Sequence, residues 1–454
     1  MLELDCGQDF APSRDEDFFA ALPPRPAVCL IETHGANAEP FLFRTQDLRR
    51  RLQRLLGPPE PSTKLLNLRD LAARVRYRLT GSRFEQAVAY YHIAKHLFPM
   101  RYRKLTRLRP PAVLKVSLRN AYPRCYVTRR IPVDDSGIPT AGAYYGPFPS
   151  RKAADAFAQQ ALDFFKVRRC QIKIRRDPAF PGCIYSEMKM CLAPCFAGCT
   201  KEEYDLEVGR LVQFLDSSGN SLRAAIESDR EQASAELDFE RAALLHKRLE
   251  KLNDALRLQP ELARRIEDLD GVILQRAAED QTIAVFAFRA GRLAEPFFLR
   301  FAEIASQPRS VEHIFKAHLE GSASGATPAA SEAGTANVGA RFIIPSSFNH
   351  QLIPASEASL PPTAASSPSA ATTEPSASAD SKPLSASASR EQLGEHLALL
   401  SRWFYSNPRD GEIFFREKDW PYRKILRACS RLLHPKAANA PAPNEPAPSG
   451  GSSL

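Results

Sequence analysis

Apolar residues near the start of the chain fall into two short runs followed by a stretch with helical spacing. The runs at 27–32 and 40–45 predict two strands. From Asp47 to Gly57, leucines recur every three or four positions and arginines occupy most positions between them. This pattern predicts an amphipathic helix capped by the aspartate and ended by the glycine. A longer helix is predicted over 83–98.

Helical spacing returns over residues 201–257 and predicts a hairpin of two helices. The first arm is 202–216 and the second, longer arm is 227–256. Along the second arm, leucines form an apolar stripe that suits either the first arm or the helix of a partner. The two uses are compatible, since a hairpin buries one face internally and leaves another face available.

A β-rich stretch, 271–301, follows, with a turn predicted at Ala290-Gly291 or Gly291-Arg292. The chain is therefore predicted to be an α+β multidomain protein. Its Ala/Ser/Pro-rich segments cannot bury a core and are predicted to be disordered, with one apolar island at 341–354. The predicted parts are an extension at 1–21, an α/β module at 22–105, a basic and Cys-rich region at 106–200, the hairpin at 201–257, a β-rich segment at 265–320 and 391–435, a linker at 321–390 and a tail at 436–454.

The net charge of +10 and the pI near 9.2 make a polyanion the first partner to consider. Residues 101–130 hold ten Lys or Arg and no acid, which favours a DNA-binding surface over an ordinary solvated face. We expect Tyr102, Tyr122 and Tyr126 within this stretch to pack inside. With no signal peptide and no apolar run of about 18 residues, a cytoplasmic protein without membrane contact is expected. The predicted DNA-binding residues are Arg49, Arg50, Arg101, Arg103, Lys104, Arg119, Arg129 and Arg130.

Five of the nine cysteines lie between residues 168 and 199. Cys170, Cys183, Cys191 and Cys195 are separated by twelve, seven and three residues, and Cys199 follows. Four thiolates on loops suit a tetrahedral zinc ion or an iron–sulfur cluster, whereas buried thiols without a metal are the alternative. Flanking arginines and lysines are expected to lower the thiol pKa values and so to favour metal.

Three segments in order resemble the UvrC family of excinucleases, which acts in bacterial nucleotide excision repair. They are YYGPFPS at 144–150, the RRC…PGCIY…KMCLAPC segment at 168–195 and LDFERAALLHKRLEKL at 237–252. The resemblance covers roughly 22–320 and resumes at 401–415. It implies a GIY-YIG nuclease module, a Cys-rich region and a UVR helical hairpin that binds UvrB, the damage-verifying helicase of the same excinuclease.

The resemblance also implies a cofactor and a partner-binding face. An iron–sulfur cluster, with zinc as the alternative, is expected on Cys170, Cys183, Cys191 and Cys195, and Cys199 lies outside the family pattern. The implied UvrB contacts on the UVR hairpin are Leu237, Phe239, Ala242, Leu245, Leu249 and Leu252.

The catalytic positions of the family's N-terminal nuclease are largely substituted here. Alignment of the motifs places Cys29 and Phe41 at the two tyrosines and Tyr90 at the metal-binding glutamate, while Arg51 keeps the family arginine. Without that carboxylate a divalent metal is not expected, because Mg²⁺ needs an oxygen ligand. Glu85 lies five residues before Tyr90, on another helix face, and does not replace it.

The family's C-terminal nuclease is RNase H-like, and only a partial, β-rich remnant of it is expected in this chain. The resemblance thus indicates a truncated, catalytically degenerate member that binds DNA and UvrB. Two alternatives stay open. One is a single-module incision endonuclease like the shorter UvrC homologues, and the other is a protein-interaction adaptor that does not touch DNA.

Overall fold

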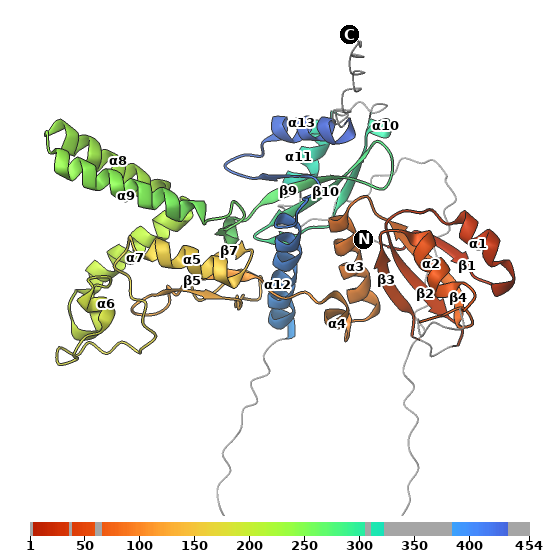
Figure 1. The fold of residues 1–454 in the computed structure, drawn as a ribbon, viewed down its shortest axis with the longest axis horizontal. Coiled ribbons are helices and arrows are strands. Elements are labelled where there is room, and N and C mark those ends of the chain that lie inside the picture. The colour runs from red at the N-terminus through yellow and green to blue at the C-terminus, as the bar shows by residue number, and fades with distance from the viewer. Residues whose placement is uncertain (1–2, 36–38, 60–65, 305–309, 322–383, 435–454) are drawn as a thin grey trace, which may run out of the picture. The chain divides into compact units, whose positions relative to one another are not determined.

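The computed structural model describes residues 3–35, 39–59, 66–304, 310–321 and 384–434. The apolar segment 341–354, the tail 436–454 and most of the predicted linker lie outside these residues. The predicted α+β class is confirmed: the described residues form three antiparallel sheets with helices packed on them (Figure 1).

The first sheet has the strand order β1-β4-β2-β3. Its helices α1 (Asp15–Ala21) and α2 (Leu48–Leu56) share one apolar core with one face of the sheet. Helix α2 begins and ends as predicted, because the Asp47 carboxylate accepts a hydrogen bond from Arg50 N at 2.9 Å and Gly57 follows its last residue. The extension at 1–21 supplies both α1 and an edge strand. The strands are β1 (Cys6–Asp9), β2 (Ala27–Thr33), β3 (Phe41–Thr45) and β4 (Ala72–Leu79).

The other face of this sheet packs against α3 (Arg83–Leu97), the predicted long helix. Alternation along β2 explains the two faces: Val28 and Leu30 join the α3 core, whereas Cys29 and Ile31 join the core with α1 and α2. The short helix α4 (Tyr102–Thr106) follows.

The second sheet has the order β6-β5-β7-β8, and α5 (Arg151–Leu162) packs against it. The YYGPFPS motif forms most of β7 and the start of α5, where the Ser150 hydroxyl accepts a hydrogen bond from Ala153 N at 3.1 Å. After α5 the chain enters an irregular Cys-rich loop that contains α6 (Ile184–Glu187) and η2 (Pro194–Phe196). The strands are β5 (Ala112–Val116), β6 (Cys125–Thr128), β7 (Ala143–Phe148) and β8 (Arg264–Arg265).

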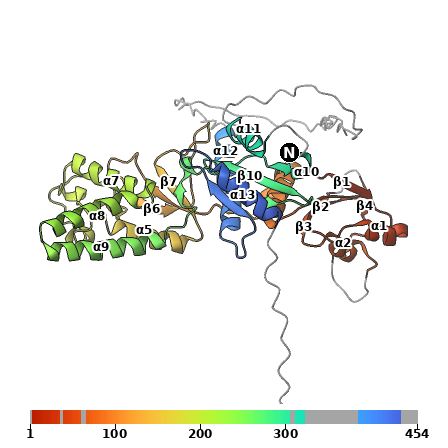
Figure 2. The same ribbon diagram turned by 90° about the horizontal axis from the view of Figure 1, so that it is seen from above.

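Three helices, not two, occupy residues 201–257. They are α7 (Lys201–Asp216), α8 (Asn220–Ala235) and α9 (Phe239–Arg257), and the hairpin consists of α8 and α9 (Figure 2). The single arm predicted over 227–256 is wrong, because the chain turns at Leu237, which adopts the left-handed conformation with φ of +61°. Asp238 then caps α9 by accepting a hydrogen bond from Arg241 N at 3.0 Å.

The third sheet has the order β11-β10-β9-β13, with β12 also paired to β10. The first of the two predicted turns is confirmed, since Ala290-Gly291 joins β10 to β11 with both residues at positive φ. Helices α11 (Val311–Gly321) and α13 (Tyr422–Leu433) share a core with this sheet. The strands are β9 (Gly271–Arg276), β10 (Thr282–Arg289), β11 (Arg292–Leu293), β12 (Phe297–Arg300) and β13 (Glu412–Phe415).

Helix α12 (Leu384–Phe404) begins inside the segment predicted to be linker and links the third sheet to α3. Leu393, Leu397 and Trp403 of α12 share one buried core with Phe84 of α3 and Phe286 of β10. Phe84 lies edge-on to Phe286, with ring centroids 5.0 Å apart.

Candidate functional site

The structure does not bring the four nuclease positions onto one face of the first sheet. Cys29 and Phe41 belong to the core shared with α1 and α2, and the Arg51 guanidinium lies 5.8 Å from the Phe43 ring on this side. Tyr90 packs on the opposite side, in the α3 core. A metal ligand and a nucleophile at these positions are therefore separated by the sheet.

The Cys29 face is closed to solvent. Cys29 is 0% exposed, and Phe10, Phe18 and Phe19 from the N-terminal extension fill the same core. Burial raises the pKa of the Cys29 thiol far above its ordinary range, so the thiol stays neutral. This position is inaccessible to a substrate.

Arg44 lies beside Tyr90, the residue that the resemblance places at the metal-binding glutamate. The Arg44 guanidinium lies over the Tyr90 ring at 5.8 Å, and burial raises the pKa of the tyrosine. Glu85 is buried at the start of α3, where its Oε2 accepts a hydrogen bond from Gly81 N at 2.8 Å. Burial raises the pKa of Glu85 to about 7.

Three of the predicted DNA-binding arginines are engaged within the chain. Arg49 donates to Leu22 O at 2.7 Å and so ties α2 to the end of α1. Arg101 pairs with Glu39, and Arg103 pairs with Glu391. Among the described residues the other predicted side chains are exposed and have no hydrogen-bond or ion-pair partner; they are Arg50, Lys104, Arg119, Arg129 and Arg130.

Of the three tyrosines expected inside, Tyr102 is buried and the other two are partly buried. The Tyr102 hydroxyl lies 2.9 Å from the Glu395 carboxylate of α12. Tyr122 lies edge-on to Tyr204, with centroids 5.4 Å apart. Tyr126 lies beneath the Arg124 guanidinium at 4.3 Å. Their rings are engaged by the protein itself and do not form an open stacking platform.

The Cys-rich loop carries the four predicted thiols. The Cys191 Sγ accepts a hydrogen bond from Ala193 N at 3.3 Å. In the described part of the chain, however, no three Cys, His, Asp or Glu side chains converge closely enough to hold one ion. The chemistry of the donor set fits a thiolate-bound metal group, while the thiols stand farther apart than coordination requires.

The expectation that flanking cations lower the thiol pKa values is wrong for Cys191 and Cys195. Burial raises the pKa of Cys191 to about 11 and also raises that of Cys195. The Arg168 guanidinium contacts a different thiol, that of Cys170. Its Nη1 lies 3.8 Å from the Cys170 Sγ, but the same guanidinium also donates to Ile172 O at 2.9 Å and Tyr122 O at 2.9 Å.

The apolar stripe of α9 divides into a buried base and an exposed tip. Leu249 and Leu252 are 9% and 0% exposed and belong to the core of the second sheet, so they do not reach a partner surface. Leu237 and Phe239, at the α8–α9 turn, are 70% and 68% exposed. Leu244, which the sequence did not single out, is 68% exposed as well.

None of the helices in the described residues combines the length and the apolar character that crossing a membrane requires.

Comparison with known proteins matches residues 112–214 to the family described as UvrC/Cho excinuclease, middle domain. The chain is 25% identical to UvrABC system protein C of Dehalococcoides mccartyi over 275 residues, which is 60% of this chain and 44% of that protein. It is 25% identical to the protein of the same name from Moorella thermoacetica over 305 residues, which is 66% of this chain and 48% of the relative. The chain thus spans about half the length of these relatives. No solved structure matches it.

Proposed function

The chain belongs to the UvrC family, and on that premise we propose that it serves nucleotide excision repair as a cytoplasmic DNA-binding protein without nuclease activity of its own. The proposal rests on the arrangement of side chains on the first sheet, which we assign to a degenerate GIY-YIG module. Cys29 is buried in a core that the N-terminal extension helps to form, and Tyr90 lies on the opposite face beside Arg44. No divalent metal is expected there, since neither position offers a carboxylate.

Incubation of the full chain with nicked, bubble and lesion-containing duplexes tests this proposal. The duplexes are offered with and without Mg²⁺ and UvrB. We expect binding to duplexes and no strand cleavage in any of these conditions. Mg²⁺-dependent cleavage would favour the single-module endonuclease instead, and absence of all DNA binding would favour the adaptor.

The unpartnered cations supply the proposed DNA contacts. Arg129 and Arg130 are exposed and follow β6, and replacing both by Gln removes two charges without removing an internal ion pair. The slope of log affinity against log salt is expected to fall by about 2, because each phosphate contact contributes about 1. Arg101→Gln is the matched control, since Arg101 already pairs with Glu39.

We further propose that the α8–α9 hairpin is the UVR motif and binds UvrB through its exposed tip. Phe239→Ser should weaken that binding by more than about tenfold, as removal of a central aromatic anchor does. The melting temperature should stay unchanged because the ring is 68% exposed. Leu206→Ser on α7 is the control, since Leu206 is 70% exposed and lies outside the hairpin. Equal binding by both variants would contradict the assignment.

We also propose that the four cysteines bind an iron–sulfur cluster, with zinc as the alternative. When bound, it would cross-link an irregular loop and take no part in a reaction. Anaerobic purification should give protein with a visible absorption band, iron and acid-labile sulfide. Cys191→Ser should abolish the band, whereas Cys199→Ser should keep it. A colourless protein that contains zinc would show that the four cysteines bind zinc and not an iron–sulfur cluster.

A further inference from the structure

Helix α13, which packs against β9 and β10 of the third sheet (Figure 1), carries a row of cations on its outer side. The helix holds Arg423, Lys424, Arg427 and Arg431 and no acidic residue. Arg423, Lys424 and Arg427 form what we call the cationic face. All three are exposed, and their side chains make no hydrogen bond or ion pair with another described residue. A solvated helix face ordinarily mixes charges of both signs, so this face differs from one.

Helix geometry holds these cations near one another. Arg423 and Arg427 are four residues apart, and so are Arg427 and Arg431, which places successive side chains one turn apart on the same side. Like charges at this spacing repel each other and destabilise the helix. A polyanion bound along the face would replace that repulsion by attraction.

The carboxylates beside α13 do not cancel its charge. Glu412 of β13 pairs with Arg431 at 2.6 Å. On α11, Glu312 pairs with Lys316 at 2.9 Å. Asp419 precedes the helix and forms no ion pair within the described residues. The four cations of α13 less the two acids Glu412 and Asp419 leave an excess of two positive charges.

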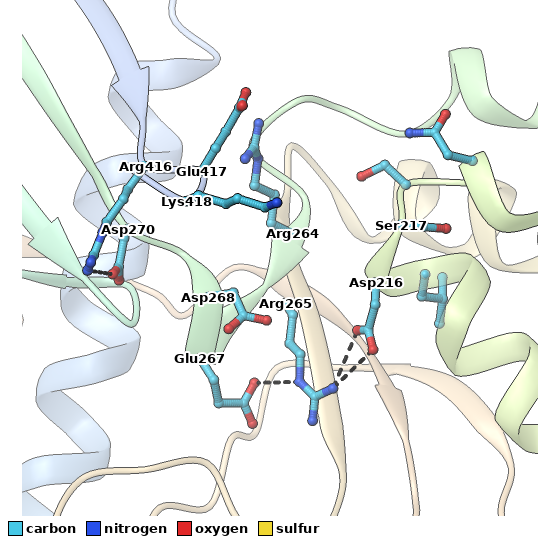
Figure 3. A pocket seen from close by; sticks show the side chains of 13 residues that line it. Asp216, Ser217, Arg264, Arg265, Glu267, Asp268, Asp270, Arg416, Glu417 and Lys418 are labelled. Atoms are coloured by element: carbon cyan, nitrogen blue, oxygen red, sulfur yellow. Dashed lines mark hydrogen bonds and ion pairs between the residues drawn. The ribbon is translucent and has the colours of Figure 1, made fainter. Parts of the chain in front are cut away.

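The pocket between the α7–α8 turn and the loop after β13 shows the opposite arrangement (Figure 3). Four cations and five carboxylates line it. Arg265 pairs with Asp216 at 3.2 Å and with Glu267 at 3.4 Å. Arg416 pairs with Asp270 at 3.7 Å. The pocket therefore offers no excess of positive charge to an anion, whereas α13 does.

The apolar side of α13 is closed to a ligand. Ile425 and Ala428 are 0% exposed and belong to the core shared with β9 and β10. Basic amphipathic helices that bind membranes or the grooves of other proteins use their apolar side to do so. Because α13 has buried that side, it attracts a ligand through charge alone. A regular row of phosphates is the ligand that suits it.

We propose that the cationic face of α13 binds the phosphate backbone of duplex DNA. The inference rests on the proposed function, which names DNA as a partner but places its contacts in other segments of the chain. The guanidinium groups donate paired hydrogen bonds to phosphate oxygens, and the ammonium group adds a point charge. Contacts with phosphates carry no base information, so binding through this face does not depend on the DNA sequence.

Replacing Arg423 and Arg427 by Gln in the full chain tests the proposal, since both side chains are exposed and their loss breaks no described contact. Labelled duplexes of two unrelated sequences are titrated by fluorescence anisotropy across a salt series. The slope of log affinity against log salt should fall by about 2, and equally for both duplexes. Replacing the same two arginines by Lys should keep the slope, because the charge is retained. The melting temperature should not fall in either variant.

Replacing Lys247 and Lys251 by Gln is the matched control. These lysines are also exposed and one turn apart, and they lie on α9, which carries acids as well as cations. The acids of that helix are Glu240, Glu250 and Asp254. The control variant loses the same net charge and should keep the salt slope of the unaltered chain.

The outcomes separate this inference from the proposed function. If the chain binds both duplexes and the Gln variant of α13 keeps the full slope, the cationic face makes no DNA contact, while the proposed function stands. If the unaltered chain binds neither duplex, the proposed function fails and the inference fails with it. An equal fall in the α9 control would refute a particular role for α13. Cosedimentation with phosphatidylserine vesicles covers the other anionic surface: vesicle binding lost in the Gln variant, with an unchanged duplex slope, would assign the face to a membrane and overturn the proposal.

Discussion

The first sheet and the second sheet differ in which side chains they keep at the positions that the family resemblance singles out. In the first sheet the strands, the capped helix α2 and an apolar core are all present, but Cys29 is buried and Phe41 carries no hydroxyl. Beside the second sheet, the Cys-rich loop keeps all four cysteines, and three of them are partly exposed. A core is preserved by any well-packed apolar residues, whereas a site needs particular side chains on one face.

The comparison teaches that structural contacts hold the first sheet together around the buried Cys29. Phe18 and Phe19 of α1 lie in the same buried core as Cys29, and Arg49 ties α2 to the end of α1. On the proposed function, substitutions of polar residues in and around this sheet should change the stability of the fold and not DNA cleavage. The loss of stability should be larger the more deeply the residue is buried.

The largest effect is expected at Glu395, a buried carboxylate of α12. It accepts hydrogen bonds from Tyr91 at 2.7 Å and Tyr102 at 2.9 Å, and so joins α12 to α3 and α4. Glu395→Ala leaves two buried hydroxyls without an acceptor, and the free energy of unfolding should fall by about 3–5 kcal/mol. Urea denaturation of the full chain measures it.

Glu391→Ala is the control for this change, because Glu391 lies one helical turn earlier and, like Glu395, which lies 3.6 Å from Arg103, forms an ion pair with that arginine. Its side chain is 38% exposed, so its loss should cost less than about 1 kcal/mol. Equal destabilisation by both variants would mean that the ion pairs to Arg103, and not the tyrosine hydrogen bonds, hold α12 in place.

The sequence predicted those elements whose signals are local. Asp47 and Gly57 mark α2, and the Ala290-Gly291 turn needs residues that tolerate positive φ. The turn at Leu237 was missed because a leucine at positive φ goes against its intrinsic preference. The helical pattern ran through it without a glycine or proline to mark the break.

Contacts between distant segments left no local signal. Nothing around Glu395 indicates that its carboxylate lies next to Tyr91, 304 residues away. The same holds for the candidate site. The four cysteines were found from their clustering, but the burial of Cys29 in a core shared with α1 depends on tertiary packing, which residue types alone do not reveal.

A smaller, pH-dependent effect is expected at Glu85. Burial raises its pKa from 4.5 to about 7, so the folded chain binds a proton that the unfolded chain releases between these pH values. Stability should therefore fall as pH rises through this window, by at most about 3 kcal/mol. Glu85→Gln should remove this fall while keeping an oxygen for Gly81 N. Urea midpoints at pH 5 and 8 measure it, and an equally steep fall in the variant would contradict the assignment.

The smallest effect is expected at Arg51, which the resemblance places at the arginine of the family's nuclease. Its guanidinium lies 5.8 Å from the Phe43 ring, so Arg51→Ala should cost only about 0.5–1 kcal/mol of stability. Arg54→Ala on the same helix, where the arginine is exposed, should cost less. Neither variant should alter cleavage of a bubble duplex in the presence of Mg²⁺, because no cleavage is expected from the unaltered chain. Cleavage by the unaltered chain and none by R51A would contradict this prediction. Arg51 would then stabilise charge in the transition state, and the first sheet would keep a nuclease site despite its buried Cys29.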